Sequence, residues 1–496
     1  MSDVREGQEL RSREEKKDEP DEGKPDEGKP DEGKPGEGED TGKSTAPPKK
    51  KWRRRYRIFQ VKESVITELL ETNPHFRSLA NIGIVMTLLL WLFDIMKNSA
   101  VEGRLYLDMT TYHVVFGPWQ KQLVAFGIWL VLIGTYFMIH PIFKVWVYLH
   151  KTIGRPADVL FVILYCLYNI VAHTSVVLLI VYLDLETGPS LFLSIEQVRF
   201  TLQCHSFVRE NAYKVLWPWD EDDETGPPVW YEGQISPKIG SFSQYLYYTF
   251  APTLVYRDHY PRLKKMRLGR AIWYLLQFGG LISCIIIILK NFIRPHLQLL
   301  EENPAMHGML ALTNCSLVGV FFMLMAGTCF LHCWQNFAGE MTLFGDRQTY
   351  GAWWRCLDYR SFYREWNLLV HDWIYCYIYQ DLRSFLGPRY VTISVFATTF
   401  MSSLFHEYVL ATGMKFFLPL LTVEFSGFGV LFYYVKPVKF LPKEVLNMLF
   451  LLGLSIGFGM MVWGYGFEMY SRDICPKETS FVNVMWPRFL ECWDIY

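Results

Sequence analysis

A histidine at the end of an uncharged apolar run is the first candidate for chemistry in this sequence. The run from Tyr390 to Phe405 carries no charged residue, and His406 follows it directly. A polar, titratable ring is costly in hydrocarbon surroundings unless it has a partner or a task. Neutral imidazole, with an ordinary pKa of about 6.5, can accept a proton from a hydroxyl group as that hydroxyl attacks an acyl carbon. His406 is therefore predicted to be a general base; the alternative is a structural histidine bonded to a backbone carbonyl or a neighbouring helix.

Asn367 and His371 form a second group of candidates, on an aromatic-rich segment. They are four residues apart, which is about one helical turn, so we expect them to share a helix face. An asparagine amide can donate a hydrogen bond to a carbonyl oxygen on which negative charge develops, the task of an oxyanion donor. The structural alternatives are helix packing for Asn367 and an interaction with the adjacent Asp372 for His371.

Long apolar runs must position these residues, and they indicate an all-α, polytopic membrane protein. The chain of 496 residues is 51% hydrophobic, and its apolar residues gather in runs long enough to cross a bilayer. About nine transmembrane helices are predicted, at Leu79–Met96, Leu123–Leu149, Val159–Leu183, Pro189–Phe207, Ala271–Phe292, Met309–Phe337, Tyr390–Phe405, Lys415–Tyr434 and Val445–Met469. A further helix, Leu368–Leu386, is predicted to be partly buried in protein at membrane depth.

The fourth predicted crossing is weakly hydrophobic because it carries Glu196, Arg199 and His205. Such side chains cannot face lipid cheaply, so this helix should turn them toward protein or water. Glu196 and Arg199 are three residues apart, which is close enough to pair on a helix. We therefore expect an ion pair inside the fourth helix.

Basic segments set the predicted orientation. The block Lys49–Arg57, the link after the second crossing and the segment Tyr256–Arg270 are all positive, which places them in the cytosol by the positive-inside rule. Nine crossings then put the C-terminus in the lumen. Residues 1–75 are predicted to be a disordered cytosolic region with three DEGKP repeats and a basic anchor to anionic headgroups, and residues 76–496 a transmembrane domain.

Several function classes lack support. A net charge of −1 favours no nucleic-acid partner, and no phosphate-binding glycine loop or GxSxG elbow is present. No spaced set of ligands completes a metal site around the two histidines. Cys475 and Cys492 bracket a polar tail: in an oxidising lumen they would form a disulfide contributing about 3 kcal/mol, and in the cytosol they would be free thiols.

Five longer stretches carry a resemblance to a known family. The chain resembles the membrane-bound O-acyltransferase (MBOAT) family, and within it the sterol O-acyltransferase (acyl-CoA:cholesterol acyltransferase) branch, over nearly everything after the N-terminal tail. The stretches are HSFVREN (His205–Asn211), FAPTLVYRDHYPR (Phe250–Arg262), LHCWQNFAGE (Leu331–Glu340), YREWNLLVHDW (Tyr363–Trp373) and FHEY (Phe405–Tyr408). Several long motifs in the right order make a specific signal. The C-terminal cysteine pair also matches.

The resemblance implies a nine-helix MBOAT enzyme of the endoplasmic reticulum membrane. It would act as a homodimer or dimer of dimers and transfer a long-chain acyl group from acyl-CoA to the 3-hydroxyl of cholesterol or a related sterol. Acyl-CoA would be a co-substrate, with no cofactor and no metal. His406 matches the catalytic histidine, and Asn367 and His371 match a pair lining the acyl-CoA tunnel. Substrate-binding residues carried over on the same basis are Arg364, Tyr379, Ser402, Trp353 and Trp354.

One short stretch departs from the family pattern. The family signature has the form FYxDWWN, and this chain has TYGAWWR at Thr349–Arg355. Trp353 and Trp354 are kept, while Thr349, Ala352 and Arg355 replace the Phe, Asp and Asn of the signature. Two alternatives to sterol acylation therefore stay open: acylation of another lipid alcohol, such as diacylglycerol or a long-chain alcohol, and a non-catalytic lipid-binding relative.

Overall fold

The computed structural model describes residues 57–218, 234–298, 304–435, 440–476 and 481–491. Residues 54–496 form one compact unit; residues 1–56, including the DEGKP repeats and most of the basic block, lie outside the described part. Residues 57–75, grouped from the sequence with the N-terminal region, belong to this unit and include helix α2 (Val65–Thr72). The described residues contain helices and no β-strand, with only two isolated bridges, Lys62 with Asp346 and Arg262 with Phe344.

Among the described residues, six helical stretches are long and apolar enough to cross a membrane, which confirms the all-α, polytopic prediction. An apolar run of this length must be helical because only a helix satisfies its own backbone groups in hydrocarbon. The six stretches contain α3 (Pro74–Glu102), α4 (Thr110–Phe116) with α5 (Trp119–Ile153), α6 (Arg155–Tyr182), α9 (Leu268–Ile288), α11 (Pro304–Gly327) with α12 (Gln335–Thr342), and α19 (Lys443–Ile474).

The other three predicted crossings correspond to helices outside these six, one of which, Leu420–Tyr434, is apolar but shorter. These are α7 (Thr187–Leu216), α16 (Val391–Met414) and the segment made of α17 (Leu420–Thr422), a π-helical turn and α18 (Val430–Tyr434). At 1.5 Å per residue, the 30 residues of α7 and the 24 of α16 extend about 45 and 36 Å. Both are therefore long enough to span hydrocarbon.

The ion pair predicted inside the fourth crossing is present. Arg199 Nε lies 2.7 Å from Glu196 Oε1, and Trp129 Nε1 of α5 donates to Glu196 Oε2 at 2.8 Å. Arg199 also donates to the carbonyl oxygen of Thr249 at 2.7 Å. The charged groups of α7 thus face protein, as their cost in lipid requires.

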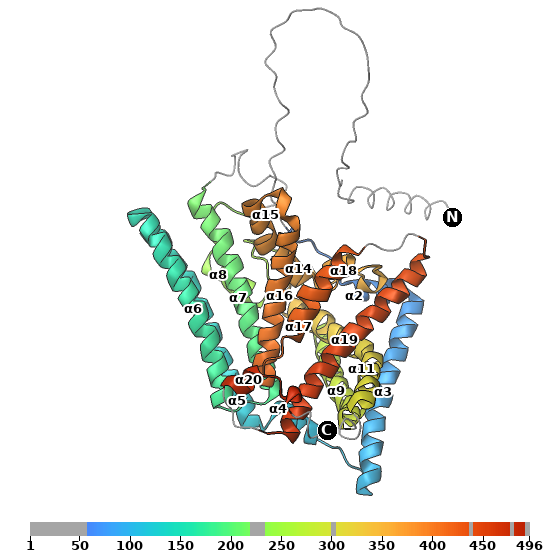
Figure 1. Ribbon diagram of the computed structural model, residues 1–496. Helices are drawn as coiled ribbons and strands as arrows, with labels where there is room; N and C mark the ends of the chain where they lie inside the picture. Colours follow the sequence, from blue (N-terminus) through green and yellow to red (C-terminus); the bar gives the residue numbers. More distant parts are fainter. Residues whose placement is uncertain (1–56, 219–233, 299–303, 436–439, 477–480, 492–496) are drawn as a thin grey trace, which may run out of the picture. The chain divides into compact units, whose positions relative to one another are not determined.

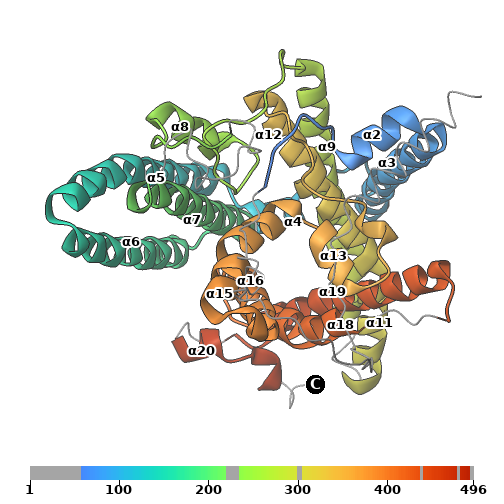
Figure 2. The same ribbon diagram turned by 90° about the horizontal axis from the view of Figure 1, so that it is seen from above.

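The helices fall into two groups with α16 between them. Figures 1 and 2 show α5, α6 and α7 on one side and α3, α9 and α11 on the other. Helix α16 packs along α7 and also contacts α17 and the π-helical turn η8 (Val423–Gly429). The candidate histidine is therefore carried by a central helix.

Helices α11 and α19 approach each other closely along small residues. A Cβ added to Gly459 would lie 2.5 Å from the Cα of Ser316, and one added to Gly319 would lie 2.9 Å from the backbone nitrogen of Gly459. Small residues at such a crossing allow backbones to come within van der Waals contact, which is how membrane helices associate without a hydrophobic drive. This close contact holds α19 against α11. Helix α19 in turn contacts α16 through the hydrogen bond from Tyr465 to Glu407.

The segment predicted as one helix at Leu368–Leu386 is an interrupted helix. It consists of α14 (Leu368–Ile374), the π-helical turn η6 (Tyr375–Tyr379) and α15 (Gln380–Leu386). A short helix, α13 (Tyr359–Glu365), precedes it. Other short helices among the described residues are α2, which leads into α3, α8 (Phe242–Phe250), α10 (Arg294–Gln298) and α20 (Phe481–Met485). Helices α15 and α20 lie near opposite ends of the unit (Figure 1).

A buried ion pair joins the end of α7 to the loop after α8. Lys214 Nζ lies 2.7 Å from Asp258 Oδ2, and both side chains are 3% exposed. The carboxylate also accepts from the backbone N–H of Ser236 at 2.8 Å and from the Tyr256 hydroxyl at 3.2 Å. The pair therefore belongs to a network in which each charge has several partners.

We expect Asp258→Leu to lower the free energy of unfolding by about 3–5 kcal/mol, because it leaves the Lys214 ammonium buried and uncompensated. The double variant Lys214→Met, Asp258→Leu should recover at least half of that loss, since neither charge then remains. Thermal unfolding of the detergent-solubilised protein, followed by tryptophan fluorescence, measures both. Equal instability of the single and double variants would contradict the prediction.

Candidate active site

His406 lies on α16 with one ring nitrogen engaged. Its Nδ1 is 2.8 Å from the carbonyl oxygen of Ser402, one turn earlier on the same helix. A carbonyl oxygen can only accept, so Nδ1 must carry a hydrogen and donate it. In the neutral ring, Nε2 then has no hydrogen and presents a lone pair. The intrahelical bond thus selects the tautomer that a general base needs.

The surroundings of His406 leave the ring accessible. The residue lies deep among protein atoms and is nevertheless exposed, so its ring borders open space within the helix bundle and not a sealed core. Phe425 of η8 packs against it edge to face, with ring centroids 5.3 Å apart. A reacting group therefore has room to approach Nε2 beside an aromatic wall.

The two residues after His406 fasten its helix to three neighbours. Glu407 is buried and accepts hydrogen bonds from the backbone N–H and the hydroxyl of Thr422 at 3.0 and 3.1 Å, and from the hydroxyl of Tyr465 on α19. The Tyr408 hydroxyl donates to Gln197 Oε1 on α7 at 2.6 Å. These bonds fix the position of His406 along and around α16. The sequence signal that could have identified Glu407 as an anchor is its carboxyl group directly after the histidine in FHEY.

Asn367 is the N-cap of α14, and the backbone N–H of His371, one turn later, donates to its carbonyl oxygen at 2.9 Å. Its backbone is extended, with φ −140° and ψ 90°, and the helix begins only at Leu368. The side-chain oxygen accepts from the backbone N–H of Val370 at 3.2 Å, which is the usual bond of an asparagine cap. With the oxygen engaged, the amide nitrogen is left as a donor for a substrate oxygen.

His371 begins a stack of aromatic rings along α14, η6 and α15. Its ring is parallel to that of Tyr375, with centroids 6.0 Å apart, and Tyr375 stacks on Tyr379 at 5.5 Å. The Tyr379 hydroxyl accepts from Arg383 at 3.0 Å. His371 Nδ1 lies 3.6 Å from Asp372 Oδ1, too far for a hydrogen bond. Within the described residues, neither Asn367 nor His371 makes a direct hydrogen bond or ring contact with His406, but Phe405 and the α14 residues Leu369 and Val370 pack on the same apolar cluster.

The remaining predicted substrate residues lie in different environments. Trp353 is buried in an apolar cluster, with its ring 5.0 Å from that of Trp366, and Trp354 packs on the same cluster while its carbonyl accepts from Asn447 at 2.9 Å. Arg364 is exposed at the end of α13. Ser402 contributes its carbonyl to His406. Substrate contact by these residues stays a prediction.

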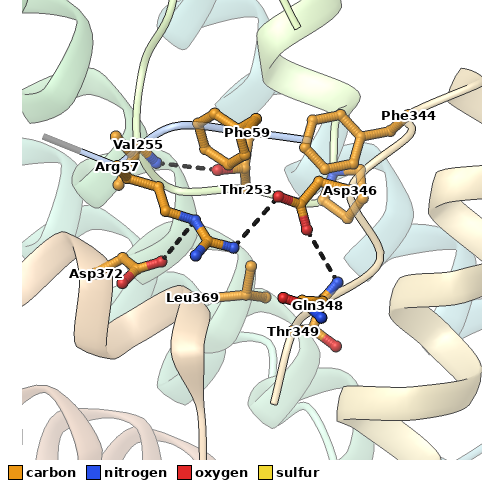
Figure 3. Close-up of a pocket in the computed structure, with 11 residues that line it drawn as sticks. Arg57, Phe59, Thr253, Val255, Phe344, Asp346, Gln348, Thr349, Leu369 and Asp372 are labelled. Carbon is orange, nitrogen blue, oxygen red and sulfur yellow. Dashed lines mark hydrogen bonds and ion pairs between the residues drawn. The ribbon is translucent and has the colours of Figure 1, made fainter. Parts of the chain in front are cut away.

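A small pocket beside α14 contains an arginine between two carboxylates. Figure 3 shows Arg57 pointing to Asp346 and Asp372; both ion pairs measure 3.3 Å, and the cavity has a volume of about 270 Å³. Burial raises the pKa of the Asp346 carboxyl, while Arg57 acts to lower it. Arg57, the one residue of the basic block within the described part, therefore binds protein carboxylates and not the lipid headgroups predicted for that block.

Two further predictions from the sequence concern metal ligands and a disulfide. Among the described residues, no group of three or more His, Cys, Asp or Glu side chains could hold a metal ion. Cys475 is disulfide-bonded. Its predicted partner, Cys492, lies outside the described residues, so the pairing itself stays a prediction.

Comparison with known proteins identifies the family. The family model described as MBOAT, membrane-bound O-acyltransferase family, matches residues 232–467, a range that includes Asn367, His371 and His406. Sterol O-acyltransferase 1 of Mus musculus is 30% identical over 448 residues, covering 89% of this chain and 80% of the relative. The chain belongs to the membrane-bound O-acyltransferase family.

Other relatives agree with this assignment. Sterol O-acyltransferase 1 of Rattus norvegicus is 30% identical over 448 residues, with 89% of this chain and 79% of the relative covered. Sterol O-acyltransferase 2 of Homo sapiens is 29% identical over 440 residues, with coverage of 88% and 80%. This chain is thus a multi-pass membrane O-acyltransferase. The helix that carries His406 and the helix capped by Asn367 both lie in the family region.

We expect Glu407→Ala to lower the free energy of unfolding of this O-acyltransferase by about 2–5 kcal/mol, because it leaves the donors of Thr422 and Tyr465 without an acceptor. Glu444→Ala is the matched control: this carboxylate is exposed in the first turn of α19, and its loss should cost less than about 1 kcal/mol. Thermal unfolding in detergent compares the two. If both variants unfold at the same temperature, Glu407 does not anchor α16.

Proposed function

We propose that this enzyme is a sterol O-acyltransferase. It transfers a long-chain fatty acyl group from acyl-CoA to the 3-hydroxyl of cholesterol or a related sterol, forming a steryl ester for storage. The observation that carries the proposal is the accessible His406 ring, whose Nδ1 is committed to Ser402 and whose Nε2 is free to accept a proton. The similarity to sterol O-acyltransferases of mammals over most of the chain supports the sterol as acceptor.

The reaction follows from these groups. Nε2 of His406 takes the hydroxyl hydrogen as the sterol oxygen attacks the thioester carbon, and the carbonyl oxygen gains negative charge. The amide nitrogen of Asn367 is proposed to donate to that oxygen. When the carbon–oxygen double bond re-forms, the carbon–sulfur bond breaks, and the CoA sulfur receives the proton held by the imidazolium. The ester forms with no covalent enzyme intermediate.

The placement of acyl-CoA is part of the proposal. The polar, anionic CoA headgroup enters from the cytosolic end, near Arg364 and the stack that ends at Tyr379, because a guanidinium suits phosphate groups. The acyl chain extends between helices toward Ser402. Acyl-CoA is a co-substrate, and no cofactor or metal is required by these steps.

The cellular setting completes the proposal. The enzyme resides in the endoplasmic reticulum membrane as a homodimer or dimer of dimers, with the N-terminus in the cytosol and the C-terminus in the lumen. A disulfide between Cys475 and Cys492 fits a luminal tail.

The first test is ester formation by purified protein supplied with labelled oleoyl-CoA and either cholesterol or diacylglycerol. We expect cholesteryl ester from the wild type and a loss of at least about 100-fold in rate for His406→Ala, because the proton acceptor is gone. His173→Ala is the matched control, since its Nδ1 makes the same bond to a carbonyl one turn earlier, Asn169 O at 2.8 Å, and it should keep its rate within a few-fold.

Other results would change the proposal in different ways. Diacylglycerol or a long-chain alcohol as the sole acceptor would replace the sterol. Binding of acyl-CoA and sterol without any ester would favour a lipid-binding role, with TYGAWWR as the altered feature. Equal loss in the two histidine variants would remove His406 from the chemistry.

A second test separates the two roles of Asn367. An aspartate caps a helix as well as asparagine does, whereas alanine costs about 0.5–2 kcal/mol. We therefore expect Asn367→Asp to unfold at the wild-type temperature but to lose most of its kcat, because a carboxylate cannot donate to the oxyanion. Asn367→Ala should lose both stability and kcat. Wild-type kcat in the aspartate variant would show that the residue is only a cap.

A further inference from the structure

The stretch TYGAWWR, Thr349–Arg355, connects two parts of the structure that are far apart in sequence. On one side of it lies η4 (Thr328–Trp334), a π-helical turn between α11 and α12. On the other side lies the junction between α13, which ends at Glu365, and α14, which begins at Leu368. Asn367, the proposed oxyanion donor, belongs to that junction. The contacts of the stretch therefore bear on where this donor lies.

Two consecutive side chains attach the stretch to the π-helical turn. The Thr349 hydroxyl donates to the carbonyl oxygen of Leu331 at 2.7 Å. The hydroxyl of Tyr350 lies 2.8 Å from Nδ1 of His332. Thr349 and Tyr350 are each 2% exposed, so a bond lost here is not replaced by one to bulk water. The start of the stretch is thus held against η4 by buried polar contacts.

The backbone of the same stretch holds the junction on both sides of Asn367. The N–H of Gly351 donates to the carbonyl oxygen of Glu365 at 2.7 Å, and the N–H of Leu368 donates to the carbonyl oxygen of Thr349 at 3.0 Å. These two bonds lie before and after Asn367 in the chain. The extended backbone of Asn367, with φ −140° and ψ 90°, is therefore held between two points of attachment.

Apolar packing also brings the junction against the helix that leads into η4. A Cβ added to Gly327 would lie 2.8 Å from Cη2 of Trp366. Apolar contact of this kind is non-directional, whereas a hydrogen bond has a preferred geometry. The packing of Trp366 brings the two parts together, and the bond from Thr349 fixes how the stretch lies along η4.

We propose that Thr349 is a positioning residue for Asn367. Its hydroxyl attaches the stretch to η4, and its carbonyl oxygen receives the first N–H of α14, so it sets where the Asn367 amide points. Phenylalanine, which the family signature has at this position, cannot donate such a bond. Threonine therefore has a role of its own in this chain. The inference rests on the proposed function, because that function makes Asn367 the oxyanion donor.

Steady-state kinetics of the purified full-length protein test the proposal. Thr349→Val removes the hydroxyl and keeps the shape, and we expect kcat to fall about fivefold or more because a displaced donor stabilises the oxyanion less. KM for oleoyl-CoA should stay within about twofold, since the oxyanion forms only in the transition state. Thr349→Ser, which keeps the donor, should retain kcat within about twofold. Equal losses in the valine and serine variants would overturn the proposal.

A double variant shows whether Thr349 acts through Asn367. In the Asn367→Asp background, Thr349→Val should lower kcat by less than about twofold, because the donor that it positions is already absent. A further loss as large as the one that Thr349→Val causes in the wild type would overturn the proposal.

Hydrogen exchange followed by mass spectrometry measures the positioning without catalysis. Thr349→Val should make amides in the peptide Tyr363–Trp373 exchange about fivefold faster, because the start of α14 opens more easily. Thr342→Val is the matched control, since the Thr342 hydroxyl also donates to a backbone carbonyl at 2.7 Å, that of Ala338, but within α12. It should leave this peptide unchanged. Thr349→Ala gives the same comparison if Thr349→Val does not yield folded protein.

The exchange experiment separates this proposal from the proposed function. Wild-type kcat in Asn367→Asp together with faster exchange in Thr349→Val would remove the oxyanion role and support the positioning role. Wild-type exchange in Thr349→Val, or an equal increase in Thr342→Val, would overturn the positioning role whatever the kinetics of the Asn367 variants.

Discussion

The exclusion of water from the hydrocarbon region is the constraint on which this structure depends. Every polar group on a spanning helix must find a partner in the protein, because lipid offers none. Glu196 and Arg199 meet each other inside α7, and Glu407 receives the hydroxyls of two neighbouring helices. Several of these polar groups make hydrogen bonds between helices and so hold the helices together.

In His406, one ring nitrogen has a hydrogen-bond partner and the other faces open space. One ring nitrogen is satisfied by its own helix, as is that of His173 on α6, and this alone would make either residue structural. The difference lies in what surrounds the second nitrogen. His173 packs its ring against Tyr408, whereas His406 borders open space beside Phe425. The reactivity proposed for His406 therefore depends on where α16 places its ring, because His173 has the same side chain and the same kind of intrahelical bond.

Much of the fold could be predicted because it depends on local composition. Apolar runs of bilayer length gave the spanning helices, and the three-residue spacing of Glu196 and Arg199 gave their pair. His406 stood out because the apolar run before it, Tyr390–Phe405, carries no charge.

Features that depend on distant residues could not be predicted in this way. The helix start that makes Asn367 a cap requires the extended backbone of that residue. The burial of Trp353 requires Trp366 and Phe450 to close over it. The partners of Glu407 come from helices that follow it in the chain, and no spacing rule within α16 reveals them.

The bridge made by Arg57 has a consequence for the shortest chain that can keep the site intact. Asp346 and Asp372 come from separate segments and lie on either side of one guanidinium, and the charge of Asp372 acts to raise the pKa of the Asp346 carboxyl. Trimming the chain up to residue 56 leaves this arrangement whole. Trimming one residue further leaves two negative charges facing each other beside His371. A shortened chain must therefore keep Arg57, which precedes the start of α3 at Pro74, if these two carboxylates are to stay balanced.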